Sequence, residues 1–283
     1  MYAVSAVLIG FASAILAGMF GIGGASLTTP ALRLIMGVSP ALALGTPLPV
    51  GIPVALAGAA TYCRRGFINR RLAFYSSLGG VGGSLGGAGL TGLINKHYLM
   101  LITGAVLLYL AGITLYRGVT GKEVTEDISE EPLLESPGRQ PCEVATTGAV
   151  PVVRPVDAGH PVYVYLLVGL GAGFFSGLLG LGGGVVLVPG FLYLLKVPIK
   201  VAFGTSLAVI GVIAVPGTII HVLYGHISWQ LFLYLSLGVV PGAIIGARIS
   251  IRAGERFLYT AFGVLLSLFA FLFIANEVIE LWF

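Results

Sequence analysis

Two glycine-rich stretches hold the residues whose types and spacing are best suited to binding a ligand inside an apolar segment. The first runs from Gly18 to Pro30 (GMFGIGGASLTTP) and the second from Gly177 to Pro189 (GLLGLGGGVVLVP), 159 residues later. Glycine permits positive φ and close backbone approach, while proline lacks an N–H donor and interrupts helices. In a segment that crosses lipid, freed backbone groups are tolerated only where protein or a water-filled cavity satisfies them. Two matched breaks therefore predict a binding site, and glycines that only let helices pack closely are the alternative.

The chemistry that these breaks offer is the binding of an anion by backbone N–H groups. A helix that restarts after a break points unpaired N–H groups and a partial positive charge at it, so two facing breaks bind an anion without a charged side chain. We expect seven glycines to present these groups: Gly21, Gly23, Gly24, Gly180, Gly182, Gly183 and Gly184. Five side-chain hydroxyls would add donors: Ser26, Thr28, Thr46, Thr205 and Ser206. Pro30 and Pro189 would hold the two breaks open.

Some of these residues occupy matching positions in the two halves of the chain. Thr46 and Thr205 lie in matching Gly-Thr pairs, and three roles stay open for them. They could cap a broken helix, contact a substrate, or form a local hydroxyl-to-carbonyl bond within a helix. Gly24 and Gly183 also match, and we expect alanine at either position to weaken anion binding.

Residue sets for catalysis or metal binding are absent from the sequence. It has no Ser-His-Asp arrangement, no HExxH motif, no Cys/His cluster and no phosphate-binding loop followed by lysine. Its two cysteines, Cys63 and Cys142, are far apart and suit neither a disulfide framework nor a metal site. No Asp or Glu lies inside an apolar segment, which disfavours a cation carrier or a carboxylate proton relay. We therefore predict a protein that is not an enzyme and needs no metal or cofactor.

Composition places the elements around these residues in a membrane. Hydrophobic residues make up 57% of the 283 residues and charged residues only 9%, whereas about a quarter of a soluble domain is charged. Eight apolar segments are long enough for helices in lipid; they span roughly residues 3–36, 41–63, 73–94, 99–116, 162–195, 201–223, 231–249 and 257–275. The fold class that follows is all-α and integral to the membrane.

The eight segments form two repeats of four. Aligning residues 17–116 with residues 176–275 without a gap gives 28 identities in 100 positions, many of them glycines. Each opening segment has about 34 residues, which exceeds the ~20 of one crossing and falls short of the ~40 of two. We therefore expect each repeat to be a re-entrant hairpin, with the glycine motif near its tip, followed by three transmembrane helices.

Positive charge predicts how the two repeats are oriented. The first repeat has four arginines between its second and third segments (residues 64–71), whereas the second repeat has its cluster one loop later (residues 248–256). Positive residues favour the cytoplasmic side, so matching loops face opposite sides and the repeats are inverted. Both chain termini are then outside, and the polar stretch between the repeats is cytoplasmic.

That polar stretch divides the chain into three parts. We assign residues 1–117 to an N-terminal membrane repeat, 118–159 to an acidic, flexible linker and 160–283 to a C-terminal membrane repeat. Residues 118–158 hold eight acidic and three basic residues, a net charge of −5, which leaves +9 elsewhere. We attribute the +9 to membrane topology rather than to nucleic-acid binding. A solvated tether is the favoured interpretation of the linker, and a regulatory or partner-binding role is the alternative.

The paired motifs, Gly21 to Pro30 and Gly180 to Pro189, resemble those of the TauE/SafE sulfite exporter family, also called the toluenesulfonate uptake permeases. The layout of four and four apolar segments around a polar linker is similar too, so the resemblance covers nearly the whole chain outside residues 118–158. It implies multi-pass transport in the inner membrane of a bacterium or archaeon, without ATP hydrolysis by the chain. The implied substrates are sulfite, sulfonates and other small sulfur-containing anions, commonly exported.

Together, the breaks and the resemblance lead us to predict a secondary transporter that exports a small oxyanion, sulfite or an organosulfonate, by alternating access. An anion channel and a transport-inactive membrane scaffold or sensor are the alternatives. The expected partners are the anionic substrate and the lipid bilayer, with no nucleic acid, and a homodimer stays open.

Overall fold

A computed structural model of the chain describes residues 2–90, 108–116, 118–119, 161–179, 183–225 and 227–282. Within these residues the chain is helical and contains no strand, as the predicted all-α class requires. Residues 120–160, and with them nearly all of the predicted linker, lie outside the described residues. The three-part division of the chain therefore stays a prediction.

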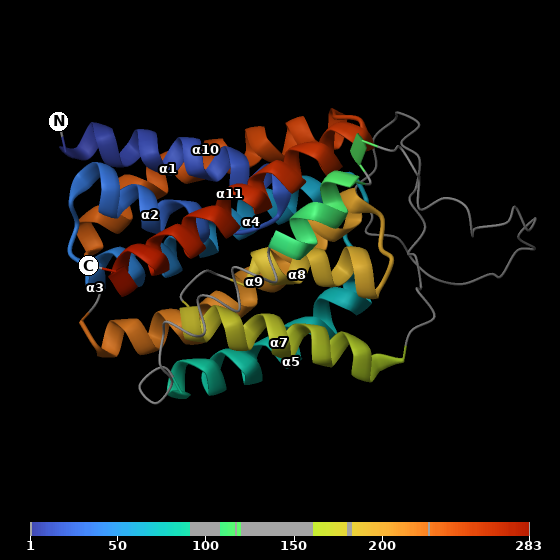
Figure 1. The fold of residues 1–283 in the computed structure, drawn as a ribbon, viewed down its shortest axis with the longest axis horizontal. Helices are drawn as coiled ribbons and strands as arrows, with labels where there is room; N and C mark the ends of the chain where they lie inside the picture. Colours follow the sequence, from blue (N-terminus) through green and yellow to red (C-terminus); the bar gives the residue numbers. More distant parts are fainter. Residues whose placement is uncertain are drawn as a thin grey trace, which may run out of the picture.

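The helices of the two halves follow one another in matching order (Figure 1). In the first half they are α1 (Tyr2–Phe20), α2 (Ala25–Met36), α3 (Pro40–Gly45), α4 (Pro47–Cys63) and α5 (Arg70–Leu90). In the second half they are α7 (Val162–Leu179), α8 (Gly184–Pro189), the π-helix η2 (Gly190–Leu194), α9 (Ile199–Leu223), α10 (Trp229–Arg252) and α11 (Glu255–Trp282).

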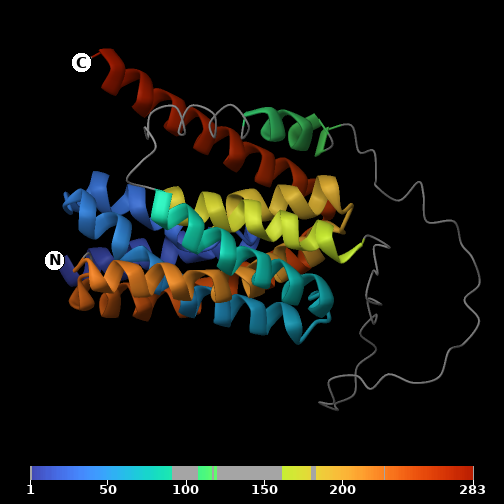
Figure 2. The same cartoon turned by 90° about the horizontal axis from the view of Figure 1, so that it is seen from below.

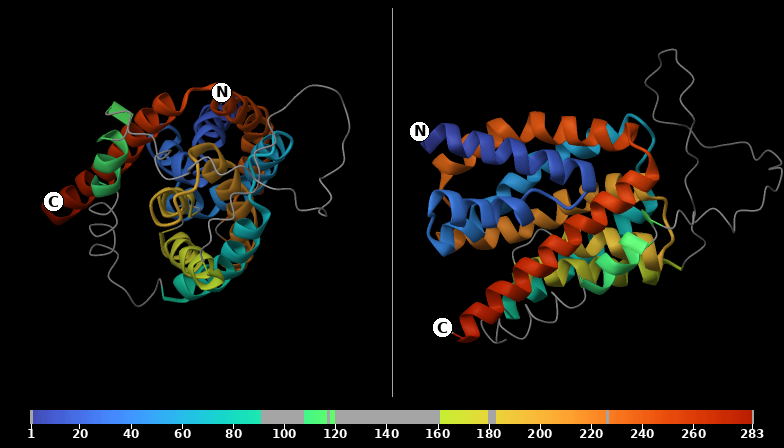
Figure 3. Two further views of the ribbon diagram at one scale, coloured as in Figure 1. Left: turned by 90° about the vertical axis from the view of Figure 1, so that its right-hand side faces the viewer. Right: turned by 45° about the horizontal axis from the view of Figure 1, so that its top comes forward.

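Length and composition suit several of these helices to a bilayer. Three of the described helices are long and apolar enough to cross one, with spans at Ala3–Phe20, Ile199–Leu223 and Trp229–Arg252. Each opening segment is a long helix followed by a short one, since α1 has 19 residues and α2 only 12. The short helix folds back beside the long one (Figure 3). The opening segment is therefore an unequal hairpin.

The two repeats exchange partners across the bundle. Helix α1 packs along α10 of the second half, and α5 packs along α7 (Figures 1 and 2). A Cβ on Gly79 of α5 would lie 2.2 Å from the carbonyl oxygen of Leu166, and a Cβ on Gly238 would lie 2.2 Å from that of Val7. Both members of the second contact are offset by 159 residues from those of the first. The duplication is therefore visible in the contacts between helices as well as in the sequence. The glycines at these contacts let the backbones of neighbouring helices pack against each other.

Matching helices run in opposite directions along the bundle. In Figure 1, α1 leads away from the N-terminus at the left, whereas α7 runs from right to left. Likewise α10 runs from left to right, and α5 runs the other way.

The centre of the bundle is formed by the second opening segment and the helix that follows it. Helix α8 lies in the middle when the bundle is viewed along its length, with the other helices around it (Figure 3, left). The ring of Phe20 lies 5.8 Å from that of Phe262 and 6.0 Å from that of Phe203. These aromatic contacts join α1, α9 and α11 beside the first glycine motif.

Basic side chains gather at one end of the bundle. Lys200 Nζ donates to the carbonyl of Ile251 at 3.0 Å, so the start of α9 lies beside the end of α10. A Cβ on Gly204 would lie 2.4 Å from the carbonyl oxygen of Phe67, so the loop between α4 and α5 is at the same end. These neighbouring segments carry Arg64, Arg65, Arg70, Arg71, Lys196, Lys200, Arg248, Arg252 and Arg256.

Candidate functional site

The first glycine motif forms a break between two helices. Helix α1 ends at Phe20 and α2 begins at Ala25. Gly21 has φ of 67° and Gly23 has φ of 79°, both in the left-handed region that residues with a Cβ rarely adopt. The two glycines therefore allow the chain to reverse here without strain.

Helix α9 holds this break in place. Ser206 Oγ lies 2.7 Å from the carbonyl oxygen of Gly21 and donates a hydrogen bond to it. A Cβ on Gly21 would lie 2.4 Å from that hydroxyl and 2.6 Å from the carbonyl oxygen of Phe203. The structure thus brings together two predicted site residues from opposite halves, Gly21 and Ser206. Position 21 requires glycine both because its φ is positive and because a Cβ would have no space.

The second break contacts the first directly. Gly183 has φ of 71° and precedes α8, while Gly180 and Gly182 lie outside the described residues. A Cβ on Gly184 would lie only 2.3 Å from the carbonyl oxygen of Ile22 and 2.5 Å from its Cα. The backbones of the two motifs therefore touch, although 162 residues separate Ile22 from Gly184.

The helices that leave the breaks begin without a side-chain cap. Gly24 precedes α2 and Gly183 precedes α8, and neither glycine has a side chain that could accept from the first turn. By contrast, Ser228 Oγ accepts from the N–H of Leu231 at the start of α10. The first N–H groups of a helix have no intrahelical acceptor and carry partial positive charge. The start of α2, which is 12 residues long, therefore presents partial positive charge at the break without a side-chain cap.

The hydroxyls beside the first break have different surroundings. Ser26 Oγ donates to the carbonyl of Ile22 at 3.3 Å, and Thr28 Oγ1 donates to that of Gly24 at 2.8 Å. Thr28 Oγ1 also lies 3.0 Å from Ser13 Oγ of α1. Thr29 is 8% exposed, and its hydroxyl has no hydrogen-bond partner among the described residues. A buried hydroxyl of this kind is available to a ligand or a water.

Thr46 and Thr205 join the two repeats. Thr205 Oγ1 accepts from the backbone N–H of Asn69 at 3.1 Å, and Thr46 Oγ1 accepts from that of Ser228 at the same distance. Asn69 and Ser228 are the N-cap residues of α5 and α10, and each side chain accepts an N–H three residues on. The four residues form two contacts related by the 159-residue offset. Both threonines thus cap helices of the opposite repeat, a form of capping that the sequence did not indicate.

The two prolines lie within the helices that follow the breaks, and their predicted role of holding the breaks open stays a prediction. Pro30 falls within α2, and Pro189 is the last residue of α8, each five residues after its helix begins. Pro189 has no N–H to donate to the preceding turn, and the chain continues into the π-helix Gly190–Leu194. A change of helix type thus follows Pro189, whereas α2 continues past Pro30 to Met36, and glycines with positive φ lie at the breaks themselves.

Gly24 and Gly183 match in sequence but differ in backbone conformation. Gly24 has φ of −69° in the right-handed helical region, whereas Gly183 has φ of 71°. A Cβ on Gly24 would meet only the side chain of Val54, at 3.1 Å. The expectation that alanine would act alike at both positions therefore has no support in their geometry.

Tyr62 is a contact of the first break that we did not predict. Its hydroxyl is 3.2 Å from the carbonyl oxygens of both Gly18 and Met19 in the last turn of α1, and the residue is fully buried. It thereby satisfies a helix end that would otherwise expose unpaired carbonyls. The aligned repeats could have indicated a polar contact at this position, because Tyr62 matches another polar residue, His221.

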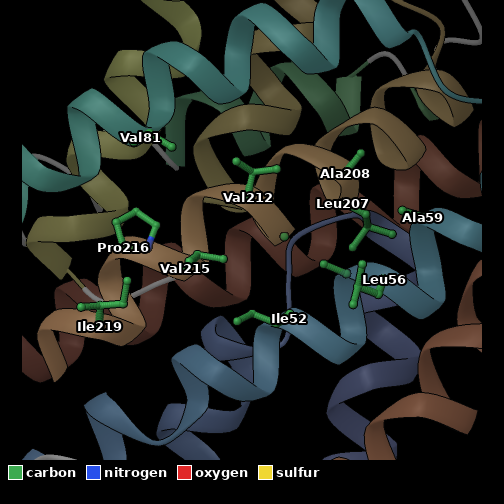
Figure 4. Close-up of a pocket in the computed structure, with 12 residues that line it drawn as sticks. Ile52, Leu56, Ala59, Val81, Leu207, Ala208, Val212, Val215, Pro216 and Ile219 are labelled. Carbon is green, nitrogen blue, oxygen red and sulfur yellow. The ribbon is translucent and has the colours of Figure 1, made fainter. Parts of the chain in front are cut away.

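A separate groove of about 660 Å³ lies between α4, α9 and Val81 of α5 (Figure 4). All the side chains that line it are apolar, among them Leu56, Leu207, Val212 and Ile219. Such a surface offers no side-chain hydrogen bond to an anion, and removing water from the anion there would cost much free energy. The groove is suited to hydrocarbon, so the breaks remain the candidate anion site.

Comparison with known proteins decides the family. The model of the family described as "Sulfite exporter TauE/SafE" matches residues 6–273. The chain belongs to this family. The resemblance drawn from the paired glycine motifs is thereby confirmed, and this TauE/SafE protein is a multi-pass membrane transporter and not an enzyme.

Curated relatives of this TauE/SafE protein carry transporter names. It is 27% identical to the probable membrane transporter protein YunE of Bacillus subtilis, covering 88% of each chain. It is 26% identical to a probable membrane transporter protein of Xylella fastidiosa, covering 91% of this chain and 88% of the relative. A shorter match, 40% identical over 24% of this chain and 29% of the relative, is to a probable membrane transporter protein of Haemophilus influenzae. No solved structure matches the chain.

Proposed function

We propose that this TauE/SafE protein is a secondary transporter of a small sulfur-containing oxyanion, sulfite or an organosulfonate, which binds where the two glycine breaks meet. The observation that carries the proposal is the contact between Gly184 and the backbone of Ile22. It puts the uncapped start of α2 and the second break at one place inside the bundle. Backbone N–H groups there can bind negative charge without a charged side chain, as expected for an anion that must also leave.

Hydroxyl donors would complete this site on one side. Thr29 has a buried hydroxyl without a partner among the described residues, and Ser26 lies one turn earlier on the same helix. At the matching positions the second half has Val185 and Val188, which donate nothing. We therefore expect the first repeat to make most polar contacts with the substrate and the second to contribute backbone and apolar surface.

We further propose that the repeats are inverted in the inner membrane of a bacterial or archaeal cell. The opposite directions of α1 and α7, and of α5 and α10, support this orientation (Figure 1). The gathering of both arginine clusters at one end supports it too, because positive residues favour the cytoplasm. The basic end is then cytoplasmic together with the linker, both termini are outside, and each opening hairpin is re-entrant.

Alternating access would follow from the exchange of partners between repeats. The pair α1 and α10 contains one helix from each repeat, as does the pair α5 and α7, and α4 packs against α9 between them. Rocking one pair against the other about the α4–α9 contact would open the breaks first to one side and then to the other. The two pairs are related by the duplication. Contacts that one pair makes in the inward-open state would therefore be made by the matching residues of the other pair in the outward-open state. We propose export as the net direction.

Counterflow in liposomes tests this function. Purified protein is reconstituted with unlabelled p-toluenesulfonate or sulfite inside, and entry of the labelled anion is followed. We expect saturable uptake that the internal anion accelerates, because a carrier returns faster when loaded. An anion channel would give uptake that does not saturate and is not accelerated, and a scaffold or sensor would give none. Either result would refute the proposal.

A further inference from the structure

We propose that His221 is a proton-binding site beside the second glycine break, and that its protonation is coupled to movement of the anion. The coupling rests on the proposed function, whereas the binding of a proton does not. His221 lies on α9 two residues before the helix ends at Leu223. A titratable residue inside a membrane-spanning helix is a functional candidate, because its charged form costs free energy within the bilayer.

His221 lines a small hollow together with two buried serines, Ser84 and Ser176. The lining comes from four helices: Leu48 of α4, Ser84 of α5, Ser176 and Gly177 of α7, and Ile213, Gly217, Ile220 and His221 of α9. The space measures about 10 Å³, close to what one water molecule needs. Ser84 is 2% exposed and Ser176 is 4% exposed, so both hydroxyls are held away from bulk solvent. None of these lining residues, from any of the four helices, is an Asp, Glu, Lys, Arg or Tyr.

The hollow adjoins the second break. A Cβ on Gly183 would lie 3.2 Å from Ser176 Cβ and 3.5 Å from its hydroxyl oxygen. A charge on His221 would therefore act on the break across one side chain, in surroundings where electrostatic interactions are stronger than in water. An imidazolium there would favour an anion at the break, and a neutral imidazole would let it leave.

The positions that match this hollow by the 159-residue offset have different residues. Tyr62 occupies the position of His221 in the first repeat, where its hydroxyl is bonded to the end of α1. The counterparts of Ser84 and Ser176 are the alanines Ala243 and Ala17. A phenol titrates near pH 10 and an imidazole near pH 6.5. At physiological pH the first repeat therefore has a fixed contact, whereas the second has a group that can change charge.

The proposed step is a reversible protonation. A neutral His221 imidazole takes one proton from hydronium at the end of the bundle where α9 ends. The N–H bond of the imidazolium forms as an O–H bond of hydronium breaks, and water is released. The same proton returns to water when the anion has left the break. In the proposed orientation this end faces the outside of the cell, opposite the basic end.

The first test observes the proton directly. Protein with ¹⁵N-labelled histidine is placed in lipid nanodiscs, and the imidazole signals are followed from pH 5 to pH 8. His221→Gln identifies the signal, and His226→Gln serves as the matched control. We expect the His221 signal to convert between neutral and charged forms within that range. An imidazole that stays in one form throughout would overturn the proposal, whether or not the protein transports an anion.

The second test measures the coupling. p-Toluenesulfonate is used because it stays anionic over this pH range, so any pH dependence arises from the protein. We expect flux in liposomes to rise several-fold as the pH falls from 8 to 6, and His221→Gln and His221→Tyr to abolish that rise while the melting temperature is kept. His226→Gln should behave like the parent. Unchanged pH dependence in His221→Gln would refute the coupling, whereas absence of flux in the parent would refute the proposed function and leave the titration to decide on the proton site.

Discussion

Replacing Gly183 by alanine tests whether the second break depends on a left-handed residue. The φ of 71° is unfavourable for any L residue with a Cβ, at a cost of about 1–2 kcal/mol. Space is a smaller concern, because the nearest atoms to the new Cβ, Ala172 O and Ser176 Cβ, are both 3.2 Å away. About 1.4 kcal/mol corresponds to one decade in an equilibrium constant, so we expect binding to weaken roughly tenfold. Calorimetric titration of detergent-solubilised protein with p-toluenesulfonate measures the loss.

Two further variants separate backbone strain from the bulk of the side chain. Gly183→Asn should retain more affinity than Gly183→Ala, because asparagine tolerates the left-handed region better. Gly24→Ala should bind within a few-fold of the parent, since its φ of −69° suits any residue and only the Val54 side chain must adjust. Equal affinity of the alanine and asparagine variants, or parental affinity of Gly183→Ala, would show that the break does not rely on a positive φ.

Three other predictions concern packing, capping and topology. Gly79→Ala should lower the melting temperature because its Cβ would lie 2.2 Å from a carbonyl oxygen of α7, whereas Gly82→Ala on the same helix, with no atom within 4 Å, should not; equal melts would contradict the exchange of partners between repeats. Thr205→Val should destabilise the protein by about 1–3 kcal/mol by leaving the buried N–H at the start of α5 unsatisfied, and Thr205→Ser should restore stability in the same denaturation assay; a neutral valine variant would exclude the capping role. The exposed native Cys63 should react with a membrane-impermeant maleimide only from the cytoplasmic side. Tyr224→Cys, with both native cysteines removed, should react only from outside, and labelling of both positions from the same side would rule out inversion.

The breaks and the duplication could be predicted because their causes are local in the sequence. Glycine at positions 21 and 23 both permits and marks the reversal between α1 and α2. The constant offset of 159 residues recurs in the contacts of Gly79 and Gly238 with neighbouring helices. Membrane class followed from composition, and the family followed from the paired motifs.

The remaining features depend on contacts between distant parts of the chain. Thr46 and Ser228 are 182 residues apart, and Thr205 and Asn69 are 136 apart, so nothing near either threonine indicates its partner. Gly24 and Gly183 likewise differ in conformation at matching positions, and their neighbours differ too, with Val54 beside Gly24 and Ser176 beside Gly183. Hydroxyl residues within an apolar helix indicate a polar contact, but the sequence alone does not distinguish a substrate from the backbone of another helix.

The measurement that tests the central claim most directly is the anomalous scattering of selenite, used in place of sulfite, in crystals of this protein. The account predicts a selenium peak at the meeting of the two breaks, with selenite oxygens within hydrogen-bond distance of backbone N–H groups at the start of α2. It also predicts that Gly183→Ala weakens this peak. A peak confined to the basic end, at residues 64–71 or 248–256, with none at the breaks, would contradict it.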